Sequence, residues 1–388
     1  MRILVYSSVF FPSVGGVERY VGELAEGLIE KGLDVTVVTR VDDPGRRVFP
    51  YPVLRRPSWI ELMAAIRRAD ILHLAGPAIV PMLLARLAGR PFVVEHHNYQ
   101  PICPNGLLFI YPGQEQCPGF FQQGRIDRCM RCQVRQVGWT RGVWRVIGTP
   151  LRRFLTQAAS ANISITNHVE NRLGLRRSKT IYYGLHRVEG ETTGEFVRTE
   201  RSRERICFAY VGRLVSEKGL ELIVEAAREL RSRGIEFRVI FVGDGDCRSR
   251  LESLVRDNQL QEHVAFTGFL SGGALEKVVE EIDVVVMPSR WEETAGLSAI
   301  EQMRRARLVI AADIGGLGEI VRGAGLLFHP GSASQLAEAM ARACKEPILI
   351  DEFGAKALKR SRELFTRDRM VDEQLGIYRC VLERRGRS

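Results

Sequence analysis

The sequence predicts an α/β protein of two domains, each a parallel β-sheet covered by helices on both faces. The chain has 388 residues, which is more than one typical domain contains. Apolar runs of strand length alternate with helical patterns, and continuous apolar strands are typical of parallel sheets buried on both faces. The alternation stops at a charged stretch, residues 187–204, and then restarts. Two successive arrays of this kind predict two Rossmann-like domains.

The N-terminal array begins with a βαβ unit. Residues 2–8 and 34–40 are apolar runs, and between them apolar side chains recur every three or four positions up to Gly32, which is the spacing of one helix face. Further strands and helices of this array are expected at 70–76, 79–89, 91–97, 143–159, 162–166 and 180–184.

The second array repeats the pattern after the charged stretch. Its strands and helices are expected at 205–212, 220–234, 237–245, 248–260, 264–269, 274–282, 283–289, 307–313 and 325–330. We therefore expect a first domain over 1–186 with a cysteine-rich insert at 101–133, a linker over 187–204 and a second domain over 205–365. Residues 366–388 are expected to form a helix that crosses back to the first domain. Ligands of such sheets lie at the carboxyl ends of the strands, which predicts a site in the cleft where the domains face each other.

Composition limits the classes of function. The formal net charge is +10 and the pI is about 9.4, so anionic ligands or surfaces are favoured. The chain has no run of 18 apolar residues, and its first residues are interpreted as a strand rather than a signal peptide. A cytoplasmic protein is expected. Nucleic acid is not an expected partner, because no recognition motif accompanies the charge.

Two cations follow the first strand of the second array. Arg213 and Lys218 lie between Gly212 and a helix, where they could bind a diphosphate. The alternative is a solvated basic loop. Gly15 and Gly16 resemble a phosphate-binding turn but lack the G-x-G-x-x-G fingerprint, so a nicotinamide-dependent oxidoreductase is disfavoured.

Two carboxylates surround a later turn. In "RWEETAGLSAIEQ", Glu293 precedes Gly296 and Glu301 lies inside the following helix. Backbone amides at the start of a helix suit an anion, and carboxylates beside a bound phosphate are expected to accept hydrogen bonds from sugar hydroxyls instead. The alternative is that Glu293 caps the helix and Glu301 is a surface residue.

Across nearly its whole length the chain resembles the family 4 retaining glycosyltransferases of the GT-B fold. The segments that carry the resemblance are "GGVERYVGELAEGL", "EHHNY", "YVGRLVSEKGLELIVEAA", "FVGDGD", "VAFTGFL", "VVVMPSRWEETAGLSAIEQM", "IGGLGEIV" and "GLLFHPGSASQLAEAM". Glu293 and Glu301 match the family's E-x7-E motif. The resemblance implies sugar transfer from a nucleotide sugar with retention of configuration and without an obligatory metal or other cofactor.

The resemblance also implies roles for individual residues. Arg213 and Lys218 would neutralise the diphosphate, Glu301 would bind the ribose, Glu293 would hold the donor sugar, and His97 would lie beside the sugar near the reacting carbon. Further contacts to the nucleotide sugar are expected from Gly15, Gly16, Gly212, Gly243, Gly245, Phe266, Gly296, Leu297 and Ser298.

The sequence departs from the family pattern at three positions. Ala295 stands where phenylalanine commonly precedes the motif glycine, and Ala306 and Leu308 stand at a glycine and a proline position. His97 is chosen over His96 because "HNY" stands where the family often has His-Asp-Tyr.

Four cysteines lie in the insert after His97. Their thiolates could form a tetrahedral structural zinc site, with buried thiols or a redox role as alternatives. They are Cys103, Cys117, Cys129 and Cys132.

Aromatic and arginine side chains alternate in residues 135–155. They suit a helix that docks on an anionic membrane surface or on a lipid-linked acceptor, and they include Trp139, Trp144, Arg141, Arg145, Arg152 and Arg153. The alternative is a core-packing helix with a solvated basic face.

The sequence thus predicts a glycosyltransferase that moves a sugar from a UDP- or GDP-linked donor to a glycan or lipid-linked acceptor in cell-surface polysaccharide or glycolipid synthesis. The protein is expected at the inner face of the cell membrane, as a peripheral protein. The alternative is a catalytically weak nucleotide-sugar-binding protein of the same fold. Donor identity, acceptor identity and oligomeric state are not predicted.

Overall fold

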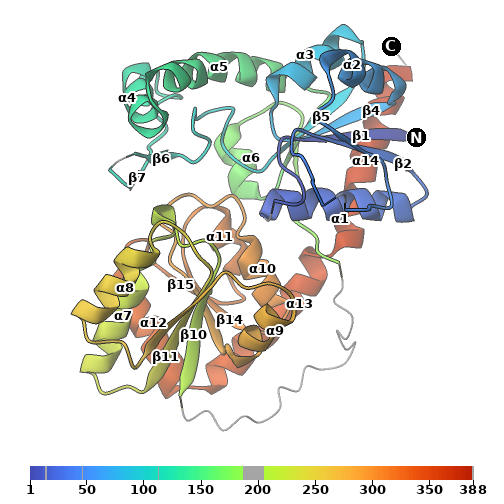
Figure 1. Ribbon diagram of the computed structural model, residues 1–388. Helices are drawn as coiled ribbons and strands as arrows, with labels where there is room; N and C mark the ends of the chain where they lie inside the picture. Colours follow the sequence, from blue (N-terminus) through green and yellow to red (C-terminus); the bar gives the residue numbers. More distant parts are fainter. Residues whose placement is uncertain (14, 46, 112, 187–204, 387–388) are drawn as a thin grey trace. The chain divides into compact units, whose positions relative to one another are not determined.

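The computed structural model describes residues 1–386 apart from 14, 46, 112 and 187–204 (Figure 1). The chain divides into two compact units. The first comprises Met1–Gly113, Cys117–Glu189 and Leu364–Ser388, and the second comprises Gln114–Gln116 and Gly190–Glu363. The linker that the sequence predicts, 187–204, lies outside the described residues.

The first unit is built on a seven-stranded parallel sheet in its described part. The strand order is β3-β2-β1-β4-β5-β8-β9, in which the chain starts near the middle, moves to one edge and then returns to the other. The strands are β1 (Arg2–Ser7), β2 (Asp34–Thr39), β3 (Val53–Arg55), β4 (Ile71–Ala75), β5 (Phe92–His96), β8 (Ala161–Ser164) and β9 (Ser178–Thr180). The helices are α1 (Gly16–Glu30), α2 (Trp59–Arg68), α3 (Ile79–Leu87), α4 (Ile126–Val137), α5 (Trp139–Gln157), α6 (Asn167–Leu173) and α14 (Arg367–Gly386).

Helix α14, at the end of the chain, packs on α1 of the first unit. Arg367 is 6% exposed and its guanidinium pairs with Glu30. Gly27 allows the two helices to approach closely, because a Cβ atom there would lie 2.5 Å from a methyl group of Val371. The last helix of the chain therefore belongs to the fold of the first unit.

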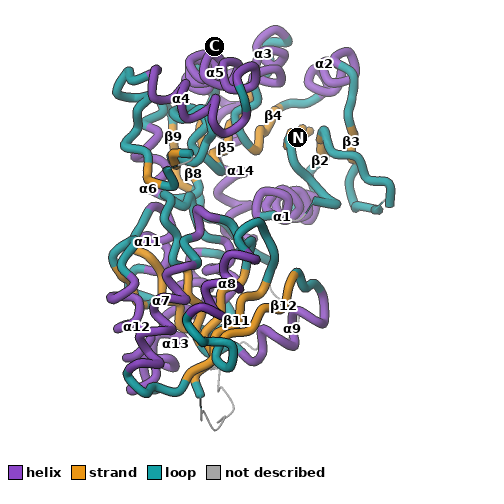
Figure 2. Tube along the Cα trace, turned by 60° about the vertical axis from the view of Figure 1, so that its left-hand side comes forward, coloured by secondary structure: helices purple, strands orange, loops and turns teal. Residues whose placement is uncertain are grey.

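The second unit repeats the same topology around a six-stranded parallel sheet in its described part. The strand order is β12-β11-β10-β13-β14-β15, and Figure 2 shows the strands flanked by helices. The strands are β10 (Ile206–Val211), β11 (Phe237–Val242), β12 (Val264–Gly268), β13 (Val284–Met287), β14 (Leu308–Ala312) and β15 (Leu326–Phe328). The helices are the 3₁₀ turn η1 (Ser216–Lys218), α7 (Glu221–Ser232), α8 (Arg248–Asp257), α9 (Gly272–Glu281), α10 (Leu297–Met303), α11 (Gly315–Val321), α12 (Ala333–Lys345) and α13 (Ile348–Leu364).

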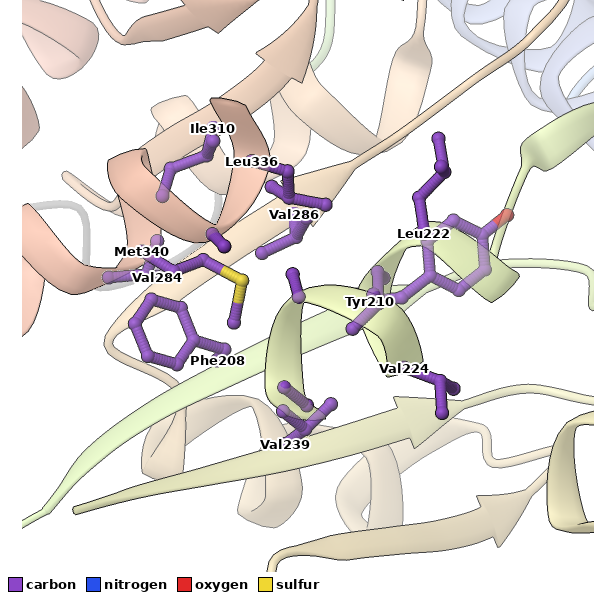
Figure 3. Close-up of a cluster of buried hydrophobic side chains, with 14 of the residues drawn as sticks. Phe208, Tyr210, Leu222, Val224, Val239, Val284, Val286, Ile310, Leu336 and Met340 are labelled. Carbon is purple, nitrogen blue, oxygen red and sulfur yellow. The ribbon is translucent and has the colours of Figure 1, made fainter. Parts of the chain in front are cut away.

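The core of the second unit lies between its sheet and helices α7 and α12. Figure 3 shows Phe208 of β10 and Val284 of β13 near Met340 of α12, with Leu222 of α7 beside Tyr210. These side chains are 0 to 2% exposed. The prediction of two Rossmann-like domains is confirmed, because continuous apolar strands do form parallel sheets buried on both faces.

Some elements differ from those the sequence predicts. Val53–Arg55 and Trp59–Arg68 form a strand and a helix that were not predicted. The stretch 180–184 is strand only up to Thr180. In the insert, β6 (Phe109–Ile110) pairs with β7 (Glu115–Gln116). None of the described helices is both long enough and apolar enough to cross a membrane.

Candidate active site

Both sheets reverse their direction of winding at one pair of neighbouring strands. In the second unit this pair is β10 and β13, and in the first it is β1 and β4. Ligands of open α/β sheets bind beyond the carboxyl ends of the strands at this point. Lys218 follows β10 and Glu293 follows β13, so the topology brings these two sequence-distant side chains to one place.

Lys218 and Glu293 form a mostly buried ion pair. The Lys218 Nζ atom lies 2.8 Å from Glu293 Oε1, and the two side chains are 15% and 5% exposed. The Ser289 hydroxyl donates a hydrogen bond to the same carboxylate oxygen, and Nζ lies 5.5 Å from the centre of the Trp291 ring. The family resemblance assigns Lys218 to the diphosphate of the donor and Glu293 to its sugar, so a direct contact between the two side chains was not predicted. Because an ammonium has three donors, Lys218 can hold Glu293 and still bind an anion.

Two glycines bring the loop after β11 against the loop after β10. A Cβ atom at Gly243 would lie 1.9 Å from the Gly212 carbonyl oxygen, and one at Gly245 would lie 2.3 Å from the carbonyl oxygen of Leu214. The Leu214 amide donates to the Asp244 carbonyl at 2.9 Å. The structure therefore brings the predicted segments 212–218 and 243–245 together. Arg213, in the first of these segments, is exposed.

Replacing Gly243 by alanine is expected to destabilise the second unit by several kcal/mol. Its backbone φ is 134°, in the region that favours glycine, and the added methyl group would overlap the Gly212 oxygen. Thermal denaturation of Gly243→Ala checks this. The control is Gly273→Ala in helix α9, where a Cβ atom meets nothing within 4 Å. That variant is expected to be as stable as the unaltered protein or slightly more stable. Equal melting temperatures for the two variants would contradict the packing described here.

The turn between Glu293 and Glu301 packs closely against α11. Gly296, the N-cap of α10, has φ 90°, and a Cβ atom there would lie 2.9 Å from Leu317 Cδ1. Leu297 and Ser298 are the first two residues of α10, and Glu301 lies one turn further along this helix. The turn thus matches the predicted loop-to-helix junction.

Sequence reasoning missed the residues that support Glu293. The Gly316 amide donates to the Glu293 carbonyl at 2.6 Å, and a Cβ atom at Gly315 would lie 2.5 Å from the same oxygen. Both glycines belong to the segment "IGGLGEIV", which the sequence links to the site only through the family resemblance. Phe266 lies on β12, which β11 separates from β10, and stacks on Phe241 with ring centres 4.9 Å apart.

In the first unit, His97 follows β5 and contacts two tyrosines. Its Nδ1 atom lies 2.7 Å from the Tyr183 hydroxyl, and its ring centre lies 4.7 Å from that of Tyr20. Tyr20 belongs to α1, which begins at Gly16 after the N-cap Gly15. The predicted Gly15, Gly16 and His97 thus belong to the first unit, whereas the other predicted donor-site residues belong to the second.

A buried carboxylate, Glu95, lies beside Tyr20 and was not predicted. Glu95 is 0% exposed and accepts hydrogen bonds from the Tyr20 hydroxyl and, at 3.0 Å, from Gln374 Nε2 of α14. His73 Nε2 of β4 lies 3.3 Å from the same oxygen. Burial acts to raise the pKa of Glu95, but His73 and Tyr20 together with His97 hold that pKa below its ordinary value. No sequence signal links these residues, because four separate elements supply them.

Stability is expected to fall as the pH drops from 6.5 towards 4. Burial lowers the pKa of both His96 and His97 from 6.5 to about 4. Below pH 6.5 the unfolded chain therefore takes up protons that the folded protein does not, and the loss levels off below about pH 4. Shifts of this size correspond to about 3 kcal/mol for each histidine. Urea unfolding between pH 7.5 and 4.5 measures the loss. His96→Gln is expected to remove about half of the pH dependence, and an unchanged dependence would contradict this origin.

The zinc site expected at the four cysteines of the insert stays a prediction. All four are free, and the described residues contain no group of three or more His, Cys, Asp or Glu side chains arranged to hold a metal ion. Cys129 and Cys132 lie on α4. Burial raises the pKa of Cys103 to about 11, and burial together with neighbouring thiols raises the pKa of Cys129 to about 12. The alternative of buried thiols fits Cys103 and Cys129, while Cys117 is partly exposed.

Comparisons with known proteins identify the family. Residues 14–179 match the family described as Glycosyltransferase Family 4, and residues 193–360 match Glycosyl transferases group 1. The α-D-kanosaminyltransferase of Streptomyces kanamyceticus is 32% identical over 78% of this chain and 74% of its own length. The O-antigen chain mannosyltransferase C of Escherichia coli is 26% identical over 99% of each chain.

Solved structures share the fold at low sequence identity. Anabaena HepE in complex with UDP matches with a TM-score of 0.72 at 17% identity, over 97% of this chain and 99% of that one. Sucrose-phosphate synthase from Thermosynechococcus elongatus matches with a TM-score of 0.71 at 20% identity, over 98% and 99%. The fold is that of the GT-B enzymes, and with the two family matches it shows that this chain belongs to glycosyltransferase family 4.

Proposed function

We propose that this glycosyltransferase moves a sugar, with retention of configuration, from a UDP- or GDP-linked donor to a glycan or lipid-linked acceptor. The main support is the Lys218–Glu293 ion pair at the point where the second sheet reverses its winding. A cation for phosphates and a carboxylate for hydroxyls are the two groups that a nucleotide sugar requires. Relatives support the substrate class, since their names describe transfer of kanosamine and mannose.

In the proposed complex, the second unit binds the donor. Arg213 is exposed at the end of β10 and, with Lys218, would neutralise the negative charge that develops on the departing diphosphate. Glu293 would accept hydrogen bonds from the donor sugar and Glu301 from the ribose. Because these cations supply the charge stabilisation, the reaction would need no metal ion. The choice of UDP draws support from HepE, whose crystal structures include complexes with UDP and UDP-glucose.

The first unit would bind the acceptor and supply His97. With its pKa lowered to about 4 by burial, His97 is neutral at physiological pH and can donate or accept a hydrogen bond without adding a charge. Tyr183 would set which ring nitrogen carries the proton. Gly15 and Gly16, at the start of α1, would approach the diphosphate.

Screening UDP- and GDP-linked sugars for slow donor hydrolysis tests the proposal. We expect nucleoside diphosphate release from at least one donor, both with and without a chelator of divalent ions. Binding of a donor without any release would favour the alternative, a catalytically weak nucleotide-sugar-binding protein. Release that stops when the chelator is added would contradict the metal-independent mechanism.

A further inference from the structure

The outer face of helix α5 exposes a stripe of large apolar side chains. Trp144, Ile147, Leu151 and Phe154 are spaced by three or four positions, so they lie along one face of the helix. They are 75%, 60%, 43% and 66% exposed. Trp139, at the start of α5, is 69% exposed. Both tryptophans therefore lie outside the core, while Val146 and Leu155 of α5 are buried as the alternative of a core-packing helix requires.

Helix α3 extends this apolar face. Val80, Leu83 and Leu87 have the same helical spacing and are 38%, 38% and 78% exposed. The two helices lie side by side (Figures 1 and 2) and are held together where Arg152 Nε donates to the Pro77 carbonyl at 3.2 Å. Seven large apolar side chains on two packed helices exceed the isolated exposed residues that are normal for a soluble protein surface.

The charged residues of helices α3 and α5 themselves are all arginines. Residues 128–169 contain seven arginines and no aspartate or glutamate, and residues 71–94 contain Arg86 and Arg90 and no acidic residue. A partner that contacts these two helices would therefore meet apolar side chains and cations, and an anionic surface is the complement of this combination.

A cavity lined by arginines lies at the carboxyl-terminal ends of the same two helices. Its volume is about 470 Å³, and its cationic lining is Arg86, Arg90, Arg177, Arg384 and Arg385. Its only hydroxyl group is that of Ser160, and none of its lining residues is acidic. Strands β5 and β8 begin beside it. The cavity therefore lies at the amino-terminal ends of these strands, whereas His97 follows the carboxyl-terminal end of β5. It is therefore separate from the candidate active site.

Two arginines of the cavity contact carbonyl groups near the ends of helices. Arg90 donates to the Arg67 carbonyl, and Arg177 Nη1 donates to the Ala159 carbonyl at 3.3 Å, both near the ends of helices. The partial negative charge at a helix end is about half a unit, which is less than the full positive charge of Arg90 or of Arg177. Each guanidinium has five N–H groups, so these contacts leave donors for a further anion.

We propose that the α3–α5 face is a docking surface for anionic phospholipid membranes, with the arginine cavity binding lipid phosphate groups. The apolar stripe would enter the boundary between headgroups and acyl chains, where tryptophan is favoured. The arginines would remain at the depth of the phosphates. The docking surface does not depend on the transfer reaction, but it would bring a lipid-linked acceptor to the first unit.

Flotation of the purified full chain with vesicles tests the docking surface. We expect binding to vesicles of phosphatidylcholine with one third phosphatidylglycerol at least tenfold stronger than to pure phosphatidylcholine vesicles. Two double variants separate the contributions: Trp144→Ser with Phe154→Ser, and Arg86→Gln with Arg385→Gln. Each double variant is expected to weaken binding to the anionic vesicles by about tenfold or more. The arginine variant loses two basic side chains, each of which changes affinity for such a surface about fivefold. The Trp144 and Phe154 variant loses apolar area that would enter the membrane boundary. Because these side chains are exposed, the melting temperature is expected to stay unchanged.

A charge-matched control removes two arginines elsewhere. Arg228→Gln with Arg256→Gln changes exposed residues of α7 and α8 in the second unit and is expected to bind anionic vesicles as the unaltered protein does. An equal loss in this control would show that total charge, not this face, is responsible, and would overturn the proposal. Equal binding to both vesicle types, or binding of inorganic phosphate without any vesicle binding, would also overturn it.

Discussion

Replacing Lys218 by methionine is expected to lower the rate of sugar transfer by about 100- to 1,000-fold, the usual effect of removing one group that stabilises developing negative charge. The same change is expected to lower stability by about 3 kcal/mol, because it leaves the 4% exposed Glu293 carboxylate without its cation. Steady-state kinetics and thermal denaturation measure the two effects on the same protein.

A double variant separates the two roles of the ion pair. In Lys218→Met with Glu293→Gln, the neutral amide no longer requires a cation, so most of the lost stability should return while transfer stays at the level of the single variant. The coupling energy from the four proteins is expected to be about 1 to 3 kcal/mol. Recovery of transfer in the double variant would show that Lys218 acts only through folding.

An exposed ion pair of the same unit provides the matched control. Arg238 and Glu281 lie 2.9 Å apart, and their side chains are 50% and 51% exposed. Arg238→Met is expected to change stability by less than about 1 kcal/mol and to leave transfer unchanged, because water screens this pair. A stability loss as large as that of Lys218→Met would contradict the importance of burial.

Replacing Tyr183 by phenylalanine is expected to lower kcat about 10- to 100-fold while leaving the dissociation constant of the donor nucleotide unchanged. The lost hydroxyl is the 2.7 Å partner of His97 Nδ1, so the imidazole would lose the contact that fixes its tautomer and orientation. The nucleotide contacts that we propose are mostly in the second unit, and for that reason donor affinity should persist. Kinetics together with nucleotide titration measure both quantities.

The neighbouring tyrosine is the control for this prediction. The Tyr182 hydroxyl accepts a hydrogen bond from Asn167 at 2.7 Å in an exposed position. Tyr182→Phe is expected to leave kcat within about twofold of the unaltered protein. If Tyr183→Phe had no larger effect than Tyr182→Phe, the positioning role of Tyr183 would be wrong.

The two sheets could be predicted from the sequence because buried parallel strands are continuous apolar runs. Val284–Met287 and Leu308–Ala312 are of this kind, and both are completely buried strands. Val53–Arg55 could not be recognised in this way, because it is a three-residue strand at the sheet edge and is only partly buried. No helix was predicted in the insert, where Pro, Gly and Gln are frequent, but residues 126–137 form one.

The candidate site was predictable in its chemistry but not in its contacts. Lys218 and Glu293 could each be chosen from local sequence. Their 2.8 Å pairing spans 75 positions of the chain and depends on β10 and β13 being neighbours in the sheet. Glu95 and Gln374 are even further apart, and no periodic pattern connects them.

One departure from the family pattern has a structural consequence. Ala306 stands where the family usually has glycine, and its backbone φ is 52°, in the left-handed region. This conformation explains why glycine is usual there and indicates that alanine adopts it at a small energetic cost.

Proton NMR of donor hydrolysis tests the central claim most directly. With an α-linked UDP- or GDP-sugar that the screen identifies, the account predicts release of the nucleoside diphosphate and appearance of the α-anomer of the free sugar first. In the Lys218→Met protein the release is expected to be at least 100-fold slower. Initial appearance of the β-anomer, or no release from any donor by the unaltered protein, would contradict a retaining glycosyltransferase that uses this site.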